Sequence, residues 1–273
     1  MMRSLLFCTA MAALAFAATA QAQEAEVTLT RLDCGHATDP WPLRAFDDTG
    51  GMDDVARALT SSCYLIRHGG DLLVWDTGID PAKSGDPDGG ITLDRTLVEQ
   101  LGELGLAPGD VDYVGISHYH YDHVGQAQFF PQATLLIGGA DWKVISDGSP
   151  AVDRNLFVNW LDNGGTVREV GGDLDLFGDG TVKLLNMPGH TGGHHALLVR
   201  LAEMGPVMLT GDLAHFTANY ANEGVPTFND DRADSLASFD RFKRMAENYG
   251  ATVIIQHEPD DIELLPAFPE AAR

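Results

Sequence analysis

The stretch ISHYHYDHVG, residues 116–125, places three histidines and an aspartate within six positions, directly after an apolar run. In His118-x-His120 the residue between the histidines points away, so both imidazoles can face one metal ion. Asp122 and His123, one turn onward, can face a second ion. Imidazole and carboxylate groups are common ligands of transition metals. The spacing therefore favours two ions rather than one.

Further metal-binding side chains follow other predicted strands. His190 lies in MPGHTGGHH (187–195), Asp212 in LTGD (209–212) and His257 in IIQHEP (254–259). Ligands converge most easily where strands end in loops at one sheet edge. A carboxylate shared by two neighbouring ions offsets their repulsion, and Asp212 is the candidate for this bridge. Two ions would lower the pKa of a shared water and supply hydroxide near neutral pH, which predicts a hydrolase.

The predicted strands form two groups of similar order, each accompanied by an amphipathic helix. They span 27–31, 63–68, 71–76 and 113–117 in the first half, and 181–187, 196–201, 207–210 and 252–256 in the second. Leucines 93, 97, 101 and 104 predict a helix that ends at Pro108-Gly109. Leu236, Phe239, Phe242, Met245 and Tyr249 predict one face of a helix that ends at Gly250. Two such halves predict two sheets packed face to face with helices outside.

We predict a single domain over residues 23–273. Between its halves, residues 140–172 are irregular and contain Trp142, Phe157 and Trp160. This segment could be a cap over a site, or its aromatic side chains could fill the core. The sequence leaves both interpretations open.

Residues 1–22 predict a signal peptide. Arg3 precedes a short apolar run, and Ala20-Gln21-Ala22 fits a cleavage site with small residues. We therefore expect a periplasmic or secreted protein after cleavage. The run is too short to favour a spanning helix, so we expect no stable membrane anchor, with an uncleaved anchor as the alternative.

Charge and cysteine content narrow the range of partners. The chain has 17 Lys and Arg against 40 Asp and Glu, a net charge of −23, which repels phosphate backbones and argues against a nucleic-acid partner. Cys34 and Cys63 both follow the predicted cleavage site. An oxidising compartment would permit them to pair, and two buried thiols are the alternative.

Taken together, these motifs resemble the metallo-β-lactamase-fold hydrolases, and among them the N-acyl homoserine lactonase-like branch. The resemblance extends to WDTGI (75–79), in which Asp76 would support a metal-ligating histidine. It implies an α/β fold, a four-layer αββα sandwich, with two divalent ions. Zn²⁺ is expected, with Mn, Co or Fe as alternatives. One ion would be held by His118, His120 and His190, the other by Asp122, His123 and His257, with Asp212 between them.

The branch implies a small-molecule substrate, an acyl homoserine lactone whose ring is opened, as in quorum quenching. Asp122 would carry a proton to the leaving group. Lactonases of this group usually have a tyrosine three residues after the bridging aspartate, where this chain has His215. Its N–H could donate to a developing oxyanion. Alternatively Tyr220 reaches the site, the substrate differs, or His215 is an ordinary polar residue. His194 is interpreted as a supporting residue, because the ligand set is already complete.

Other functions fit parts of the pattern. A hydrolase of the same fold could act on another ester, an organophosphate or a β-lactam, although secreted β-lactamases of this fold generally lack the aspartate at position 212. Glutathione thioester hydrolases share more ligands but belong where glutathione is abundant, which the signal peptide opposes. His120 argues against the oxygen-reducing di-iron relatives. A metal-binding protein without turnover is the alternative from another class. A homodimer is left open.

Overall fold

The computed structural model describes residues 25–85 and 90–273, so the predicted signal peptide lies outside the described residues. The first sheet has the order β1-β2-β3-β4-β5-β6 and the second β11-β10-β9-β8-β7. The strands are β1 (Val27–Pro42), β2 (Ala56–His68), β3 (Asp71–Trp75), β4 (Tyr113–Gly115), β5 (Thr134–Gly138), β6 (Val167–Val170), β7 (Leu174–Asp175), β8 (Val182–Asn186), β9 (His195–Leu201), β10 (Gly205–Leu209) and β11 (Thr252–Ile254).

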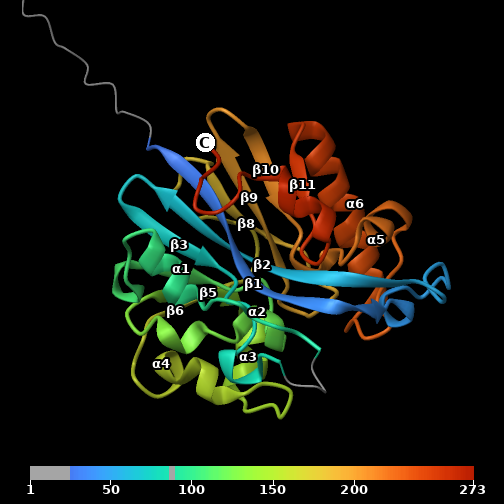
Figure 1. Cartoon of the computed structure of the whole chain (residues 1–273), viewed down its shortest axis with the longest axis horizontal. Coiled ribbons are helices and arrows are strands. Elements are labelled where there is room, and N and C mark those ends of the chain that lie inside the picture. Colours follow the sequence, from blue (N-terminus) through green and yellow to red (C-terminus); the bar gives the residue numbers. More distant parts are fainter. Residues whose placement is uncertain (1–24, 86–89) are drawn as a thin grey trace, which may run out of the picture.

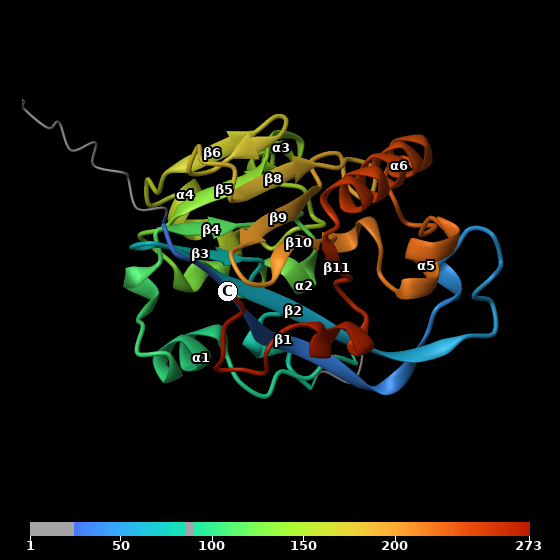
Figure 2. The ribbon, with the colours of Figure 1, turned by 90° about the horizontal axis from the view of Figure 1, so that it is seen from above.

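Helices cover the outer face of each sheet (Figures 1 and 2). The α-helices are α1 (Leu97–Glu103), α2 (Tyr121–Val124), α3 (Gly139–Ser146), α4 (Val158–Leu161), α5 (Thr217–Asn222) and α6 (Arg232–Tyr249). Short 3-10 helices are η1 (Arg44–Phe46), η2 (Pro81–Lys83), η3 (Pro108–Asp110), η4 (Ala127–Phe129), η5 (Arg154–Phe157), η6 (Gly211–Leu213) and η7 (Pro259–Leu264). Within the described ranges, no helix is both long enough and apolar enough to cross a membrane.

Three apolar cores stack through the molecule and confirm the predicted αββα sandwich. The central core lies between the sheets, where Leu73 and Trp75 of β3 pack with Leu197 of β9 and others. A second core joins the first sheet to α1 and the segment that contains α3 and α4. A third joins the second sheet to α6 through Phe239 and Phe242. Burial of apolar side chains on both faces of each sheet fixes the order of the layers.

The predicted strands are observed, and the structure adds several that the sequence did not suggest. β3, β4, β5 and β6 run parallel, so their C-terminal ends lie at one edge of the first sheet. In the second sheet only β10 and β11 are parallel. β5 and β6 were not predicted because β5 directly precedes α3 and β6 is short and half polar.

The distal parts of β1 and β2 form an arm, which we define as residues 37–60 (Figure 1). The arm extends past the sheet toward α5, where the side chain of Asn219 and the backbone of Thr227 contact it. Asn219 Nδ2 donates to Phe46 O at 2.6 Å, and Thr227 N donates to Ala45 O at 2.9 Å. These bonds hold the arm over the end of the sandwich that carries the histidines.

Of the two interpretations of residues 140–172, the structure supports core filling. Phe157 and Trp160 are buried in the core shared with α1, and Trp160 Nε1 donates to Ala133 O at 2.9 Å. None of the described residues that line the cavity at the histidine cluster belongs to this segment. The part of the chain that covers the site is instead the arm, which was not predicted.

Cys34 and Cys63 form a disulfide between β1 and β2, which answers the question that the sequence left open. Both residues are fully buried, and the bond closes a loop with a sequence separation of 29. A loop of this size stabilises the folded state by about 3.5 kcal/mol, chiefly by restricting the unfolded chain.

We therefore expect the double substitution Cys34→Ala and Cys63→Ala to lower the free energy of unfolding by about 2–4 kcal/mol. Urea unfolding followed by circular dichroism measures this, with dithiothreitol-reduced wild-type protein as the matched control. If neither sample unfolds at a lower urea concentration than the oxidised wild-type protein, the expectation is contradicted.

Candidate metal centre

The seven predicted ligands lie together at one end of the sandwich, although they come from four separate loops. These loops follow β4, β8, β10 and β11. The side chains form two groups in which the ligand atoms all lie within 4.8 Å of one another. One group is His118, His120, His190 and Asp212, and the other is Asp122, His123 and His257.

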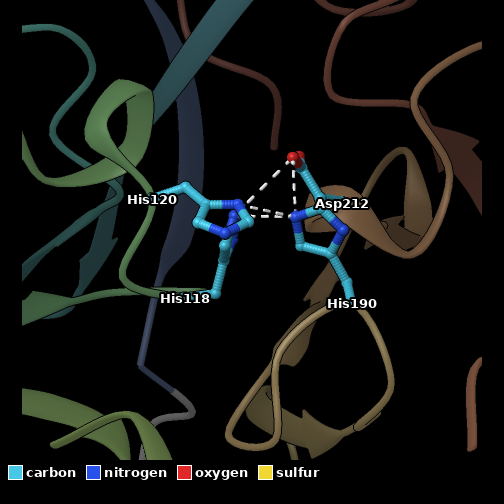
Figure 3. A group of neighbouring side chains, drawn as sticks. All are labelled: His118, His120, His190 and Asp212. Atoms are coloured by element: carbon cyan, nitrogen blue, oxygen red, sulfur yellow. Dashed lines mark hydrogen bonds and ion pairs between the residues drawn. The ribbon is translucent and has the colours of Figure 1, made fainter. Parts of the chain in front are cut away.

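In the first group, three imidazole nitrogens point at a common centre (Figure 3). His190 Nε2 lies 3.1 Å from His118 Nε2 and 2.9 Å from His120 Nδ1. The other nitrogen of His190, Nδ1, lies 2.8 Å from Asn229 Oδ1, which can only accept, so Nδ1 carries the proton and Nε2 a lone pair. Burial lowers the pKa of His118 and of His190 well below the usual value. Neutral imidazoles whose lone pairs converge in this way fit a cation.

The second group is arranged around the other side of the same aspartate. His123 Nε2 lies 3.2 Å and His257 Nε2 3.1 Å from Asp212 Oδ1. Asp122 Oδ2 lies 3.8 Å from His123 Nε2 and 3.7 Å from His257 Nε2. His123 Nε2 is buried, and although Asp212 Oδ1 lies within ion-pair distance, the nitrogen has no partner with hydrogen-bond geometry among the described residues. This group also fits a cation, because an orphaned buried nitrogen, a second imidazole and two carboxylates face one point.

Asp212 lies between the two groups and presents one oxygen to each. Its Oδ2 lies 3.3 Å from His190 Nε2, while Oδ1 faces the second group. The backbone N–H of Asp212 donates to His194 Nε2 at 3.0 Å, and His194 Nδ1 lies 2.9 Å from Met187 O. Burial lowers the pKa of His194 to about 3, so the ring stays neutral. His194 thus supports the backbone of Asp212 and lies outside both ligand groups.

Asp76 supports the second group from behind. It follows β3 with φ at +55°, a left-handed conformation that is uncommon for non-glycine residues. Its Oδ2 lies 2.9 Å from His123 Nδ1, and its Oδ1 accepts from Ser117 N at 2.7 Å. The carboxylate therefore fixes the orientation of the His123 ring, with Nε2 toward the centre.

A cavity of about 280 Å³ opens above the two groups. Its floor carries ligand side chains, and its walls are mainly apolar. The lining residues are Trp41, Phe46, Leu59, Ile91, His120, Tyr121, Asp122, Asp212, His215, Phe228 and His257. A site with this lining can hold an apolar molecule that places one polar group against the histidines.

His215 is buried beside Asp212, and Tyr220 is not near the site. His215 Nε2 lies 3.1 Å from Asp212 Oδ2, and the ring packs edge-on against Phe46 and Phe228. Burial lowers the pKa of His215, so the ring is neutral and has one N–H to donate. Tyr220 instead packs against Phe242 of α6 and lies outside the cavity lining. The alternative in which Tyr220 reaches the site is therefore wrong.

Sequence reasoning missed two kinds of site residue. The first is the set of apolar side chains on the arm, Trp41, Phe46 and Leu59, which no strand pattern in that region suggested. The second is Asn229, which sets the proton position of His190 from 39 residues away.

Comparison with known proteins gives a family and several relatives. The profile of the metallo-beta-lactamase superfamily matches residues 56–257. The N-acyl homoserine lactonase AttM of Rhizobium radiobacter is 30% identical over 223 residues, which cover 72% of this chain and 81% of the relative. The protein of the same name from Azorhizobium caulinodans is 31% identical over 193 residues, which cover 65% of this chain and 68% of the relative.

Solved structures share the fold at lower sequence identity. An N-acyl homoserine lactone hydrolase with N-hexanoyl-L-homoserine at its catalytic metal centre is 21% identical, with a TM-score of 0.77 over 91% of this chain and all of that chain. The dizinc quorum-quenching lactonase AidC is 17% identical, with a TM-score of 0.67 over 91% of this chain and 90% of that chain. At these identities the likeness concerns the fold.

Proposed function

The chain belongs to the metallo-beta-lactamase superfamily, and from that premise we propose that it is a dinuclear metal-dependent hydrolase that opens the lactone ring of N-acyl homoserine lactones. The observation that carries the proposal is the pair of ligand groups on either side of Asp212, with Oδ2 3.3 Å from His190 Nε2 and Oδ1 3.1 Å from His257 Nε2, beneath an apolar cavity. The curated relatives support it, since they are named N-acyl homoserine lactonases.

The residues of the chain divide the work of the reaction. When bound, two divalent ions lower the pKa of water and polarise a carbonyl group. The buried histidines and Asp212 would hold these ions. Asp122 lies at the cavity floor and is partly exposed, so it can hold a proton and pass it to the alkoxide that leaves when the ring opens. His215 directs its Nε2–H at Asp212 Oδ2 on the same floor, and it would turn that N–H to a carbonyl oxygen that gains negative charge once Asp212 is engaged by the ions.

The walls of the cavity support an acyl lactone over a more polar substrate. Trp41 and Leu59 from the arm face Ile91 and Phe228 from two other loops. An acyl chain would lie against these side chains and bury apolar surface at about 25 cal/mol per Å². That contact would anchor the lactone ring over the ligand groups and exclude bulk water from the reacting carbonyl.

The same site admits a second substrate class within the fold, another ester, an organophosphate or a β-lactam. The apolar walls are compatible with several esters, whereas Asp212 argues against a β-lactam. A metal-binding protein without turnover would not require the apolar cavity. Export by a signal peptide over residues 1–22, a periplasmic or secreted location and a homodimer stay predictions.

The proposal is tested by a hydrolysis panel on purified protein with metal content measured in parallel. We expect zinc-, cobalt- or manganese-loaded protein to open acyl homoserine lactones of the C4 to C12 series, followed by proton release. Chelator-treated protein is the control and should be inactive until metal is restored. If fully loaded protein leaves every lactone intact and hydrolyses another ester or a β-lactam, the lactonase proposal is wrong.

A further inference from the structure

A carboxylate outside both ligand groups connects the chain segments that carry the first group. Asp141, in the first turn of α3, is 1% exposed. Its Oδ2 accepts from Tyr119 N at 3.2 Å and from Thr191 Oγ1 at 2.8 Å, and its Oδ1 accepts from Gly193 N at 2.7 Å. Tyr119 lies between His118 and His120, and Thr191 directly follows His190. One side chain thus bonds to both segments.

These two segments belong to different sheets. The loop that carries His118 and His120 follows β4 of the first sheet, and the loop that carries His190 follows β8 of the second. The distances at the first group, 3.1 Å and 2.9 Å between imidazole nitrogens, therefore depend on how the two loops are joined. The close packing around Asp141 leaves little freedom, since a Cβ on Gly193 would lie 2.6 Å from Asp141 N.

Only an ionised carboxylate satisfies this position. All three partners of Asp141 are donors, two backbone N–H groups and one hydroxyl, and a carboxylate offers acceptors alone. An asparagine of the same shape would set an N–H₂ group against at least one of these donors. Burial raises the pKa of Asp141 to about 7, while the hydrogen bonds from Thr191, Gly193 and Tyr119 lower it and favour the ionised form. A nearby cation would favour the charged form.

We propose that Asp141 is a positioning residue that holds the loops of the two sheets at ligating distance, so that its loss weakens binding of the ion at His118, His120 and His190. The proposal rests on the proposed two-metal function. Replacing residues that orient metal ligands typically weakens metal affinity by roughly 10- to 100-fold. In the described part of the chain, Asp141 makes no hydrogen bond to the loop that carries His257. The ion of the second group should therefore be retained.

The test is a zinc titration of Asp141→Asn in competition with a chromophoric chelator, with metal per chain measured after dialysis. We expect one of the two ions to bind about 10- to 100-fold more weakly and the other to bind as in the wild type. A purely structural role would lower the unfolding midpoint of the metal-free protein without separating the two affinities. Excess zinc should restore the kcat of Asp141→Asn for lactone opening and leave its KM unchanged.

Asp230→Asn is the matched control. Asp230 is exposed, and its carboxylate accepts from Gly192 N at 3.1 Å in the same loop. We expect both ions to bind this variant with wild-type affinity.

If Asp141→Asn does not fold, the pair Thr191→Val and Thr191→Ser decides. The first removes the hydroxyl donor to Asp141 and should weaken one ion, and the second keeps the hydroxyl and should restore it. Wild-type affinity for both ions in Asp141→Asn and Thr191→Val would overturn the inference and leave the proposed function intact. A wild-type protein that binds fewer than two ions would instead overturn the proposed function, and this inference with it.

Discussion

Replacing Asp212 by alanine is expected to lower kcat/KM for lactone opening by at least about 10³-fold and to reduce the bound metal. Asp212 faces both ligand groups, with Oδ1 3.1 Å from His257 Nε2 and Oδ2 3.3 Å from His190 Nε2. Without it, two cations would repel each other with no shared anion between them. Steady-state kinetics and elemental analysis of the same preparation measure both effects.

The variant Asp212→Asn separates charge from shape. Its amide has nearly the same size but no negative charge, so we expect it to lose activity almost as fully as Asp212→Ala. Asp230→Asn removes a carboxylate outside the site and should leave the rate unchanged. Near wild-type activity and full metal content in Asp212→Ala would show that the bridging role is assigned to the wrong residue.

Replacing His215 by phenylalanine is expected to lower kcat by about 10²- to 10³-fold, the usual effect of losing one donor to an oxyanion. Phenylalanine keeps the packing against Phe46 and Phe228 and removes the N–H beside Asp212. KM should change little, because the donor matters most when charge develops on the carbonyl oxygen. Initial rates over a range of lactone concentrations separate the two parameters.

The variant His215→Tyr restores a hydroxyl donor and is the matched partner of His215→Phe. We expect its kcat to be at least about tenfold higher than that of His215→Phe, because a phenol O–H can replace the imidazole N–H as donor. Equal rates for the two variants, or a wild-type rate in His215→Phe, would mean that His215 fills space and donates nothing.

Several features of the fold could be predicted because they depend on local pattern. The alternation of apolar residues identified most core strands, and the helical spacing identified α6 and the centre of α1. The helix predicted from Leu93 to Pro108-Gly109 spans only Leu97–Glu103. The pattern was less reliable at the level of single residues. Phe239 and Phe242 are buried as expected, but Tyr249 is 40% exposed, and the guanidinium of Arg200 lies 4.4 Å above its ring. The end of a helix often turns out of the core, and sequence spacing does not show where this occurs.

The ligands could also be predicted, because metal chemistry restricts which side chains serve and the strand ends restrict where they lie. His118, His120, Asp122 and His123 are adjacent in sequence, and the more distant ligands each follow a predicted strand. The structure brings all of them together, with Asp212 between the two groups. Their role as ligands follows as a proposal from that geometry.

By itself, the sequence determined the type of fold and the residues that we propose as ligands, since both follow from residue type and short-range spacing. The tertiary structure alone decided what surrounds those ligands. The arm supplies the apolar wall, Asn229 sets the proton on His190, and Asp141 joins loops of two sheets. Each of these relations links residues far apart in the chain, through contacts that exist only once the sheets have packed, and no local pattern encodes such contacts.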